Sequence, residues 1–292
     1  MLTTPEILKK VRELEIKSKR LTRHIFTGEY HSAFKGRGMS FREVREYYAG
    51  DDVRFIDWNV SARFNHPFSK LFEEERELTV MLLVDISASS LFGTVRASKK
   101  DMITEICAVL AFSAINNNDK VGAILFSDRV ERYIPPKKGR QHALYIVREL
   151  LTAQPRKKGT RISEALRFFN NSIRQKSICF ILSDLLDDKY EEDLKVASKK
   201  HDLTGIKIYD KMDMQLPSAG LLEVEDAETG KSMWIDSSDY LVQSNYQQRF
   251  FAATEQSKSI FLKAGSDLLH IRTDEDYVKV LKKFFIGRSK PA

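Results

Sequence analysis

The chain contains 292 residues, of which 42% are hydrophobic and 30% are charged, with 13 glycines and 7 prolines. This composition excludes a fibrous repeat and an intrinsically disordered chain, and the length suits one main core of about 200 residues with an appended segment. The net charge of +7 is gathered in residues 9–45 and 129–161. Basic clusters of this kind are usually solvated faces, although they also bind phosphate or acidic protein surfaces.

Neither a signal peptide nor a membrane span is expected. The first twenty residues are charged throughout and lack an apolar core. The longest apolar runs, such as VMLLV and AVLAF, fall far short of the roughly 20 residues that cross a bilayer. Cys107 and Cys179 lie in apolar runs without C-x-x-C spacing, so we expect two buried, reduced thiols and a cytoplasmic protein.

Residues 1–77 are predicted to form an N-terminal segment ahead of a domain spanning 78–292. Residues 5–21 have helical periodicity, and the stretch that follows is dense in arginine, aromatic residues and aspartate. Interleaved opposite charges favour an internal network of ion pairs around a small apolar core containing Tyr47, Phe55 and Trp58. The alternative is a backbone nest for an anion at Gly36 and Gly38, beside Lys35 and Arg37.

From about Leu78, short β-rich runs alternate with amphipathic helical windows, which is the pattern of a parallel sheet covered by helices. We therefore predict a doubly wound α/β fold with a mainly parallel sheet. The predicted strands are 78–86, 120–127, 130–136, 177–185, 203–210 and 268–271, and helices are expected near 103–114, 144–151, 161–173, 189–200, 238–264 and 274–285. Two short β runs flanking residues 228–230 predict an inserted hairpin, in which Trp234 either packs on the body or faces a partner.

The stretch LLVDISASS carries Asp85, Ser87 and Ser89 at the end of the first predicted strand. A serine nucleophile would need a nearby histidine and usually a G-x-S-x-G turn, and neither accompanies this stretch. A phosphoaspartate site would want a second carboxylate where Ser87 stands. The remaining alternatives are a cap for the next helix and a metal site.

Two later residues favour the metal site. Thr160 lies in a loop before a predicted helix, and Asp184 ends a buried strand. In a sheet of order 3-2-1-4-5-6, the strands that end in Asp85 and Asp184 are neighbours at the switch point, where ligands bind. Two carboxylates and three hydroxyls form an all-oxygen set suited to Mg²⁺, with Mn²⁺ or Ca²⁺ as alternatives.

The set Asp85, Ser87, Ser89, Thr160 and Asp184 resembles, residue by residue, the metal-ion-dependent adhesion site of von Willebrand factor A-type domains. Many relatives carry Ser-Asp-Gly where this chain has Ser-Asp-Leu185. Asp187 and Asp188, close behind, either compete as metal ligands or begin the next helix, and we expect the latter. The pieces GRGMSF, REYYAGDDVRFIDW and SAR resemble the signature of the bacterial domain-of-unknown-function 58 family, in which such a segment precedes an A-type domain.

The two resemblances imply a non-enzymatic interaction module that grips an acidic partner residue through bound Mg²⁺. Members of the family are commonly encoded beside MoxR-type AAA+ ATPases, so an adaptor for such an ATPase is the expected role. The basic run PRKKGTR, residues 155–161, adjoins Thr160 and would favour an acidic partner. The alternatives are a metal-dependent phosphoester hydrolase using Arg37 or Lys158, and a protein that binds nucleic acid through its basic clusters.

Overall fold

The computed structural model describes residues 4–25, 40–73, 77–93, 98–155, 159–187, 189–225, 230 and 232–289. The chain divides into two compact units, one made of Met1–Phe34 with Leu78–Ala292 and the other of Lys35–Glu77. The second segment of the larger unit begins at Leu78. The first helix, α1 (Thr4–Ile25), belongs to the larger unit instead of to the segment that follows it.

The larger unit is built on one six-stranded sheet, and the predicted doubly wound α/β fold is confirmed. Its strand order, numbered from the first core strand, is the predicted 3-2-1-4-5-6. Five strands run parallel, and only the edge strand β5 pairs antiparallel, with β4. Across the sheet the strands are β5 (Val130–Lys137), β4 (Lys120–Phe126), β3 (Thr79–Asp85), β6 (Ile178–Ser183), β7 (Asp202–Tyr209) and β10 (Asp267–Arg272).

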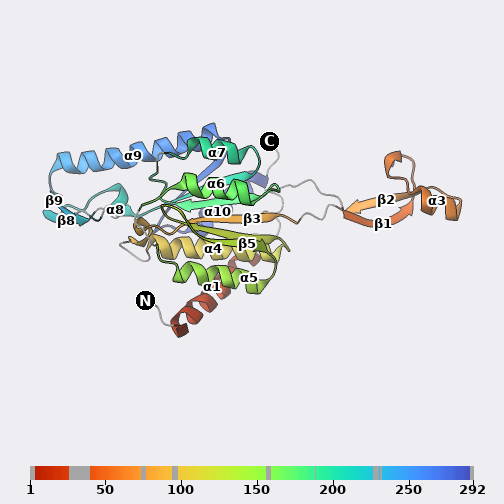
Figure 1. Cartoon of the computed structure of the whole chain (residues 1–292), viewed down its shortest axis with the longest axis horizontal. Coiled ribbons are helices and arrows are strands. Elements are labelled where there is room, and N and C mark those ends of the chain that lie inside the picture. The colour runs from red at the N-terminus through yellow and green to blue at the C-terminus, as the bar shows by residue number, and fades with distance from the viewer. Residues whose placement is uncertain are drawn as a thin grey trace. The chain divides into compact units, whose positions relative to one another are not determined.

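Helices cover both faces of this sheet, as Figure 1 shows. Every residue of β6 and all but the first of β3 are buried, because parallel strands between two helical layers have no wet face. One apolar core lies under α4 (Lys99–Asn116), α5 (Arg140–Thr152) and α10 (Tyr277–Ser289). The other lies under α6 (Ile162–Ser172), α7 (Glu191–Ser198) and α9 (Tyr240–Lys263).

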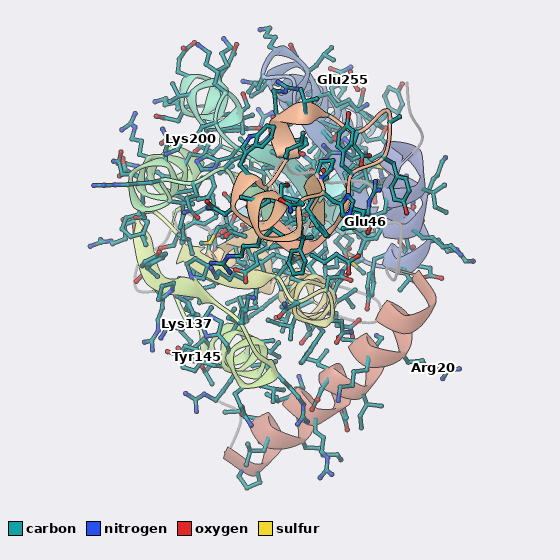
Figure 2. The ribbon with its side chains drawn as sticks, turned by 90° about the vertical axis from the view of Figure 1, so that its right-hand side faces the viewer. Arg20, Glu46, Lys137, Tyr145, Lys200 and Glu255 are labelled. Atoms are coloured by element: carbon teal, nitrogen blue, oxygen red, sulfur yellow. The ribbon has the colours of Figure 1, made fainter. Side chains whose placement is uncertain are left out.

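The helix α1 lies across α4 and α5 (Figure 2). Val11, Leu14 and Leu21 pack against the core beneath α4 and α5. Glu15 is 5% exposed, and Arg140 Nη2 donates a hydrogen bond of 2.8 Å to its carboxylate. That bond, with a smaller effect of Lys19, holds the pKa of Glu15 at about 2, so α1 is fastened by both apolar contact and a charged pair.

The predicted inserted hairpin is present as β8 (Leu221–Glu225) and β9 (Ser232–Asp236), which follow the short helix α8 (Lys211–Met214). The hairpin and α8 lie at the same end of the larger unit (Figure 1). Trp234 is 68% exposed, so it opens to solvent instead of packing on the body.

The smaller unit holds an antiparallel pair, β1 (Ser40–Glu46) with β2 (Phe68–Glu73), together with a 3₁₀ turn η1 (Val53–Phe55) and the helix α3 (Trp58–Phe64). Ion pairs join Arg45 to Asp51 at 2.8 Å and Arg54 to Asp52 at 2.6 Å, as the internal network predicts. The expected core position of Trp58 is wrong, because its side chain is 70% exposed. Lys35 to Gly38 lie outside the described residues, so the anion nest stays a prediction.

Two further expectations concern the chain as a whole. Cys107 and Cys179 are both free and buried, and burial raises the pKa of each thiol. Across the described ranges, no helix has the length and apolar character that crossing a bilayer requires.

Candidate metal centre

Asp85 ends β3 at the switch point of the sheet, where the chain leaves β3 and β6 toward opposite faces. Its carboxylate is 2% exposed. The Ser87 amide donates to Oδ1 at 2.8 Å and the Ser183 hydroxyl donates to Oδ2 at 2.6 Å. Since Ser183 ends β6, the second bond ties the carboxyl ends of the two central strands together.

Ser87 and Ser89 lie in the loop that follows, where η2 (Ala88–Leu91) forms one tight turn. Their hydroxyl oxygens are 3.0 Å apart. Ser87 occupies the N-cap position of η2 without a side-chain capping bond. The next long helix, α4, is capped by Ser98 in a capping box with Asp101. The helix-cap interpretation of the D-x-S-x-S stretch is therefore wrong for α4.

Asp184 follows β6 directly and is 6% exposed. Its Oδ2 accepts a hydrogen bond of 3.3 Å from Lys99 Nζ, whereas its Oδ1 is buried and has no hydrogen-bond partner in the described part of the chain. An unpartnered buried carboxylate oxygen is costly unless another ligand satisfies it. Asp184 thus presents one free oxygen at the same sheet edge as Asp85.

Thr160 is placed by contacts on both sides of β3. The amide of Arg161 donates to the Ser127 carbonyl after β4, and the amide of Ile162 donates to Asp187 Oδ2 after β6, each at 2.8 Å. These two bonds hold the Thr160 loop over the carboxyl end of the sheet. The Thr160 hydroxyl is buried and, like Asp184 Oδ1, has no hydrogen-bond partner among the described residues.

The loop after β6 differs from expectation at one position. Asp187 does not begin the next helix, because it caps α6 through its bond to Ile162 and also accepts the Lys189 amide. Asp188 lies outside the described residues. Leu185 has a backbone φ of 54° and is 1% exposed, so it occupies a left-handed conformation that glycine adopts more easily.

The carboxylates of Asp85 and Asp184 interact unfavourably when both are ionised. Burial first, and the charge of Asp184 second, raise the pKa of Asp85 to about 6. Two buried carboxylates that both ionise repel each other, and a divalent cation between them would relieve that repulsion. The Lys99 ammonium, 3.3 Å from Asp184 and 3.1 Å from Asp213, supplies part of this positive charge already.

These five residues fit a hard divalent cation. The donor set contains only carboxylate and hydroxyl oxygens, which Mg²⁺ prefers. Two of its buried oxygens, Asp184 Oδ1 and Thr160 Oγ1, are unpartnered within the described residues. Among the residues that the structure describes, no group of three or more His, Cys, Asp or Glu side chains is placed to hold a metal ion.

The family model described as "Protein of unknown function DUF58" matches residues 43–257. The chain belongs to this DUF58 family. It is 28% identical over 291 residues to the uncharacterized protein Rv1480 of Mycobacterium tuberculosis strain H37Rv, covering 99% of this chain and 92% of that protein.

Two solved structures are similar to this DUF58 chain. BatB from Bacteroides thetaiotaomicron, a conserved hypothetical protein, has 17% identity and a TM-score of 0.48, covering 73% of this chain and 98% of that one. The SpRpn10 VWA domain has 14% identity and a TM-score of 0.40, covering 74% of this chain and 100% of that one.

Two charged residues near the site were missed by reasoning from the sequence. Lys99 is 2% exposed, and Lys207 on β7 is fully buried. Lys207 Nζ has no hydrogen-bond partner in the described chain and lies 5.6 Å from the centre of the Phe250 ring. Lysine is ordinarily exposed, so no local pattern marks either residue. The basic residues Arg156, Lys157 and Lys158 lie outside the described residues.

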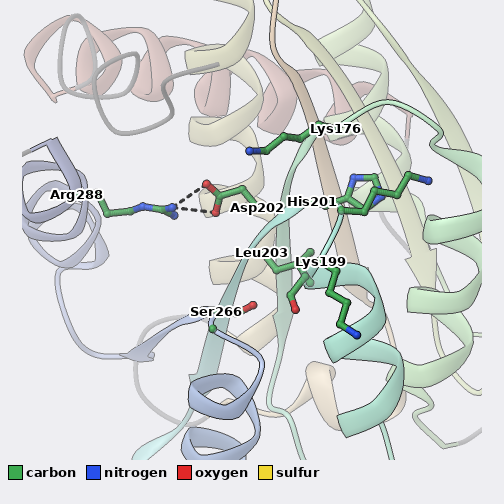
Figure 3. A pocket seen from close by; sticks show the side chains of 10 residues that line it. Lys176, Lys199, His201, Asp202, Leu203, Ser266 and Arg288 are labelled. Carbon is green, nitrogen blue, oxygen red and sulfur yellow. Dashed lines mark hydrogen bonds and ion pairs between the residues drawn. The ribbon is translucent and has the colours of Figure 1, made fainter. Parts of the chain in front are cut away.

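A separate polar pocket of about 300 Å³ lies at the opposite edge of the sheet, near the start of β7 (Figure 3). Its cations are largely engaged. Arg288 binds Asp202 through two hydrogen bonds, and Lys200 donates to the carbonyls of Asn170 and Ile173. His201 hydrogen-bonds Ser177, and burial lowers its pKa to about 4. This pocket shares no residue with the metal centre.

Proposed function

We propose that this DUF58 protein is a metal-dependent protein-interaction module. Asp85, Ser87, Ser89, Thr160 and Asp184 hold Mg²⁺, and a carboxylate of a partner protein completes the coordination. The observation that carries the proposal is the pair of unpartnered buried oxygens, Asp184 Oδ1 and Thr160 Oγ1. They come from two separate loops and both belong to the predicted ligand set.

The chemistry of the donor set supports an open coordination position. Mg²⁺ takes six ligands in near-octahedral geometry and usually keeps several waters. Asp85 already accepts hydrogen bonds on both oxygens. The serine and threonine hydroxyls are therefore needed as further protein ligands of the ion. A hard cation left with exchangeable positions binds a carboxylate readily. Mn²⁺ fits the same set, and Ca²⁺ fits less well because it prefers more oxygen ligands.

The partner in this proposal is a MoxR-type AAA+ ATPase, for which the chain acts as an adaptor. The DUF58 resemblance is what points to this class of ATPase. A partner that contributes a carboxylate would also be drawn by positive charge, and the basic residues of the run ending at Arg161 supply it.

The proposal treats the module as non-enzymatic. Hydrolysis of a phosphoester would require a general base beside the metal. Three histidines of the larger unit have described side chains: His142 stacks on Tyr145, His201 hydrogen-bonds Ser177 at the opposite end of the sheet, and burial lowers the pKa of His270 to about 4. No hydrogen bond joins any of the three to the candidate ligands in the described chain, so no observation favours the hydrolase alternative.

The substitution Thr160→Val tests the proposal. Valine has the shape of threonine, and the Thr160 hydroxyl makes no hydrogen bond in the described structure, so the metal-free variant should fold as stably as the natural chain. Loss of one ligand should weaken Mg²⁺ or Mn²⁺ binding by at least about tenfold in isothermal titration. Capture of a MoxR-type ATPase encoded in the same genome should fall in parallel.

Thr104→Val is the matched control. Thr104 is also buried, but its hydroxyl donates to the Lys100 carbonyl within α4, so metal binding should not change. A variant is better than a chelator here because the ATPase itself uses Mg²⁺. Equal metal affinity in the natural chain and Thr160→Val would refute the ligand set, and equal ATPase capture would refute the role of the metal in docking.

A further inference from the structure

The cation nearest to the candidate metal ligands is part of the chain itself. Lys99 is the first residue of α4, and its ammonium group lies 3.3 Å from Asp184 Oδ2 and 3.1 Å from Asp213 Oδ2. Only 2% of Lys99 is exposed. Carboxylates that pair with a buried ammonium group offset its loss of hydration, and Lys99 has two of them.

Other hydrogen bonds hold the backbone of Lys99 and the carboxylate of Asp213. The backbone at Lys99 is fixed by the Ser98–Asp101 capping box and by its amide bond to the Phe92 carbonyl at 2.9 Å. Asp213 Oδ2 also accepts the Asp210 amide at 2.7 Å, in the capping box of α8. The ammonium group therefore bridges two carboxylates, of which Asp184 is a candidate metal ligand and Asp213 is not.

Asp184 divides its two oxygens between two functions in this arrangement. Oδ2 faces Lys99, and Oδ1 is the buried oxygen with no hydrogen-bond partner in the described chain. A metal ion on Oδ1 would lie within a few ångströms of the Lys99 ammonium group, and two cations at that separation repel each other. Asp213 would stabilise the ammonium group when the metal competes for Asp184.

We propose that Lys99 is a resident cation that lowers the affinity of the Asp85–Asp184 site for divalent metal, and that Asp213 offsets this effect by holding the ammonium group. This inference rests on the proposed metal site. Its consequence is that the free protein binds Mg²⁺ weakly and retains it better once a partner carboxylate adds negative charge.

The test is Mn²⁺ binding measured by isothermal titration and by electron paramagnetic resonance, at pH 8, where protons compete little for carboxylates. Lys99→Met should bind Mn²⁺ about tenfold more tightly, because a repelling charge is gone. Asp213→Asn should bind about tenfold more weakly, because Lys99 then pairs with Asp184 alone. In the double variant that combines Lys99→Met with Asp213→Asn, the loss of Mn²⁺ affinity caused by Asp213→Asn should disappear.

Three further variants serve as controls for this test. Lys99→Gln keeps hydrogen-bond donors without the charge and covers the case in which Lys99→Met does not fold, and it should also tighten binding. Lys99→Arg keeps the charge and should stay within about threefold of the natural chain. Lys100→Met is the matched control, because Lys100 Nζ donates to the Ala153 carbonyl instead of to the site.

The outcomes separate this inference from the proposed function. If the natural chain binds Mn²⁺ but Lys99→Met and Lys99→Gln bind no more tightly, Lys99 is a structural brace and the inference is overturned. If Lys99→Met binds Mn²⁺ and the natural chain does not, the inference is supported. If neither the natural chain nor any variant binds Mn²⁺, the metal site fails and the inference fails with it.

Discussion

Replacing Asp85 by asparagine should make the metal-free protein more stable, which is the reverse of what most buried polar substitutions do. Burial and the charge of Asp184 raise the pKa of Asp85 from 3.8 to about 6. The folded state therefore penalises the ionised carboxylate. At pH 7.5 this penalty amounts to about 3 kcal/mol of unfolding free energy, at roughly 1.4 kcal/mol for each pH unit between the two pKa values.

Asparagine removes the charge and keeps most of the hydrogen bonding. Its amide oxygen can accept from the Ser87 amide as Asp85 does now. Its amide nitrogen would donate to Ser183, which now donates to Asp85, and this reversal costs about 1 kcal/mol. The net expectation at pH 7.5 is therefore a gain of about 2 kcal/mol for Asp85→Asn.

The pH dependence of this gain has a definite sign. A carboxyl group whose folded pKa is raised carries no penalty below about pH 4 and the full penalty above about pH 6. The gain should therefore shrink to less than about 1 kcal/mol at pH 5. Excess Mg²⁺ should stabilise the natural protein and leave Asp85→Asn unchanged, because only a state that binds the ion is stabilised by it.

Urea unfolding followed by circular dichroism, with a chelator or with Mg²⁺, measures both effects. Asp119→Asn is the control, because Asp119 is equally buried but lies at the other end of the sheet, where it accepts the Leu78 amide. Mg²⁺ should stabilise the Asp119→Asn variant as much as it stabilises the natural chain. An Asp85→Asn protein that is less stable than the natural chain in chelator at pH 7.5 would refute the electrostatic reasoning.

Substitutions at two more positions test neighbouring features of the site. Burial lowers the pKa of Lys207 to about 8, so Lys207→Met should raise the unfolding free energy by about 3 kcal/mol at pH 7. This gain should fade between pH 8 and 10.5. The absence of any gain at pH 7 would contradict the prediction. Leu185→Gly should be less destabilising than Leu185→Ala in thermal unfolding, because glycine alone relieves the positive φ of Leu185; the opposite ranking would show that the backbone there is unstrained.

The sheet was predictable because its signals are local. Most of the six core strands are apolar β-rich runs, and their order follows from the doubly wound pattern. The hairpin of β8 and β9 was marked by a turn between two short β runs. By contrast, α8 has only four residues, too few to show any periodicity, and the β1–β2 pair lies in a charged stretch without alternation.

The candidate ligands follow from the sequence pattern and remain a prediction, whereas the charged residues beside them could not be found from the sequence. Asp85, Ser87 and Ser89 share one stretch of sequence, and strand context supplied Thr160 and Asp184. Lys99 and Asp213 are separated by more than a hundred residues along the chain and meet only through the fold. The exposure of Trp58 was also beyond sequence reasoning, since a small two-stranded unit has little interior in which to bury an indole ring.

Because α1 packs against α4 and α5, the first 77 residues cannot be removed without exposing part of the larger unit's core. Cutting the chain before β3 would strip away a helix that covers α4 and α5, leaving the apolar contacts of Val11 and Leu14 open to water and Arg140 without its carboxylate. Excising only Lys35–Glu77 and bridging the gap would preserve that cover. The smaller unit thus interrupts the chain between a helix and a strand that belong to one compact body.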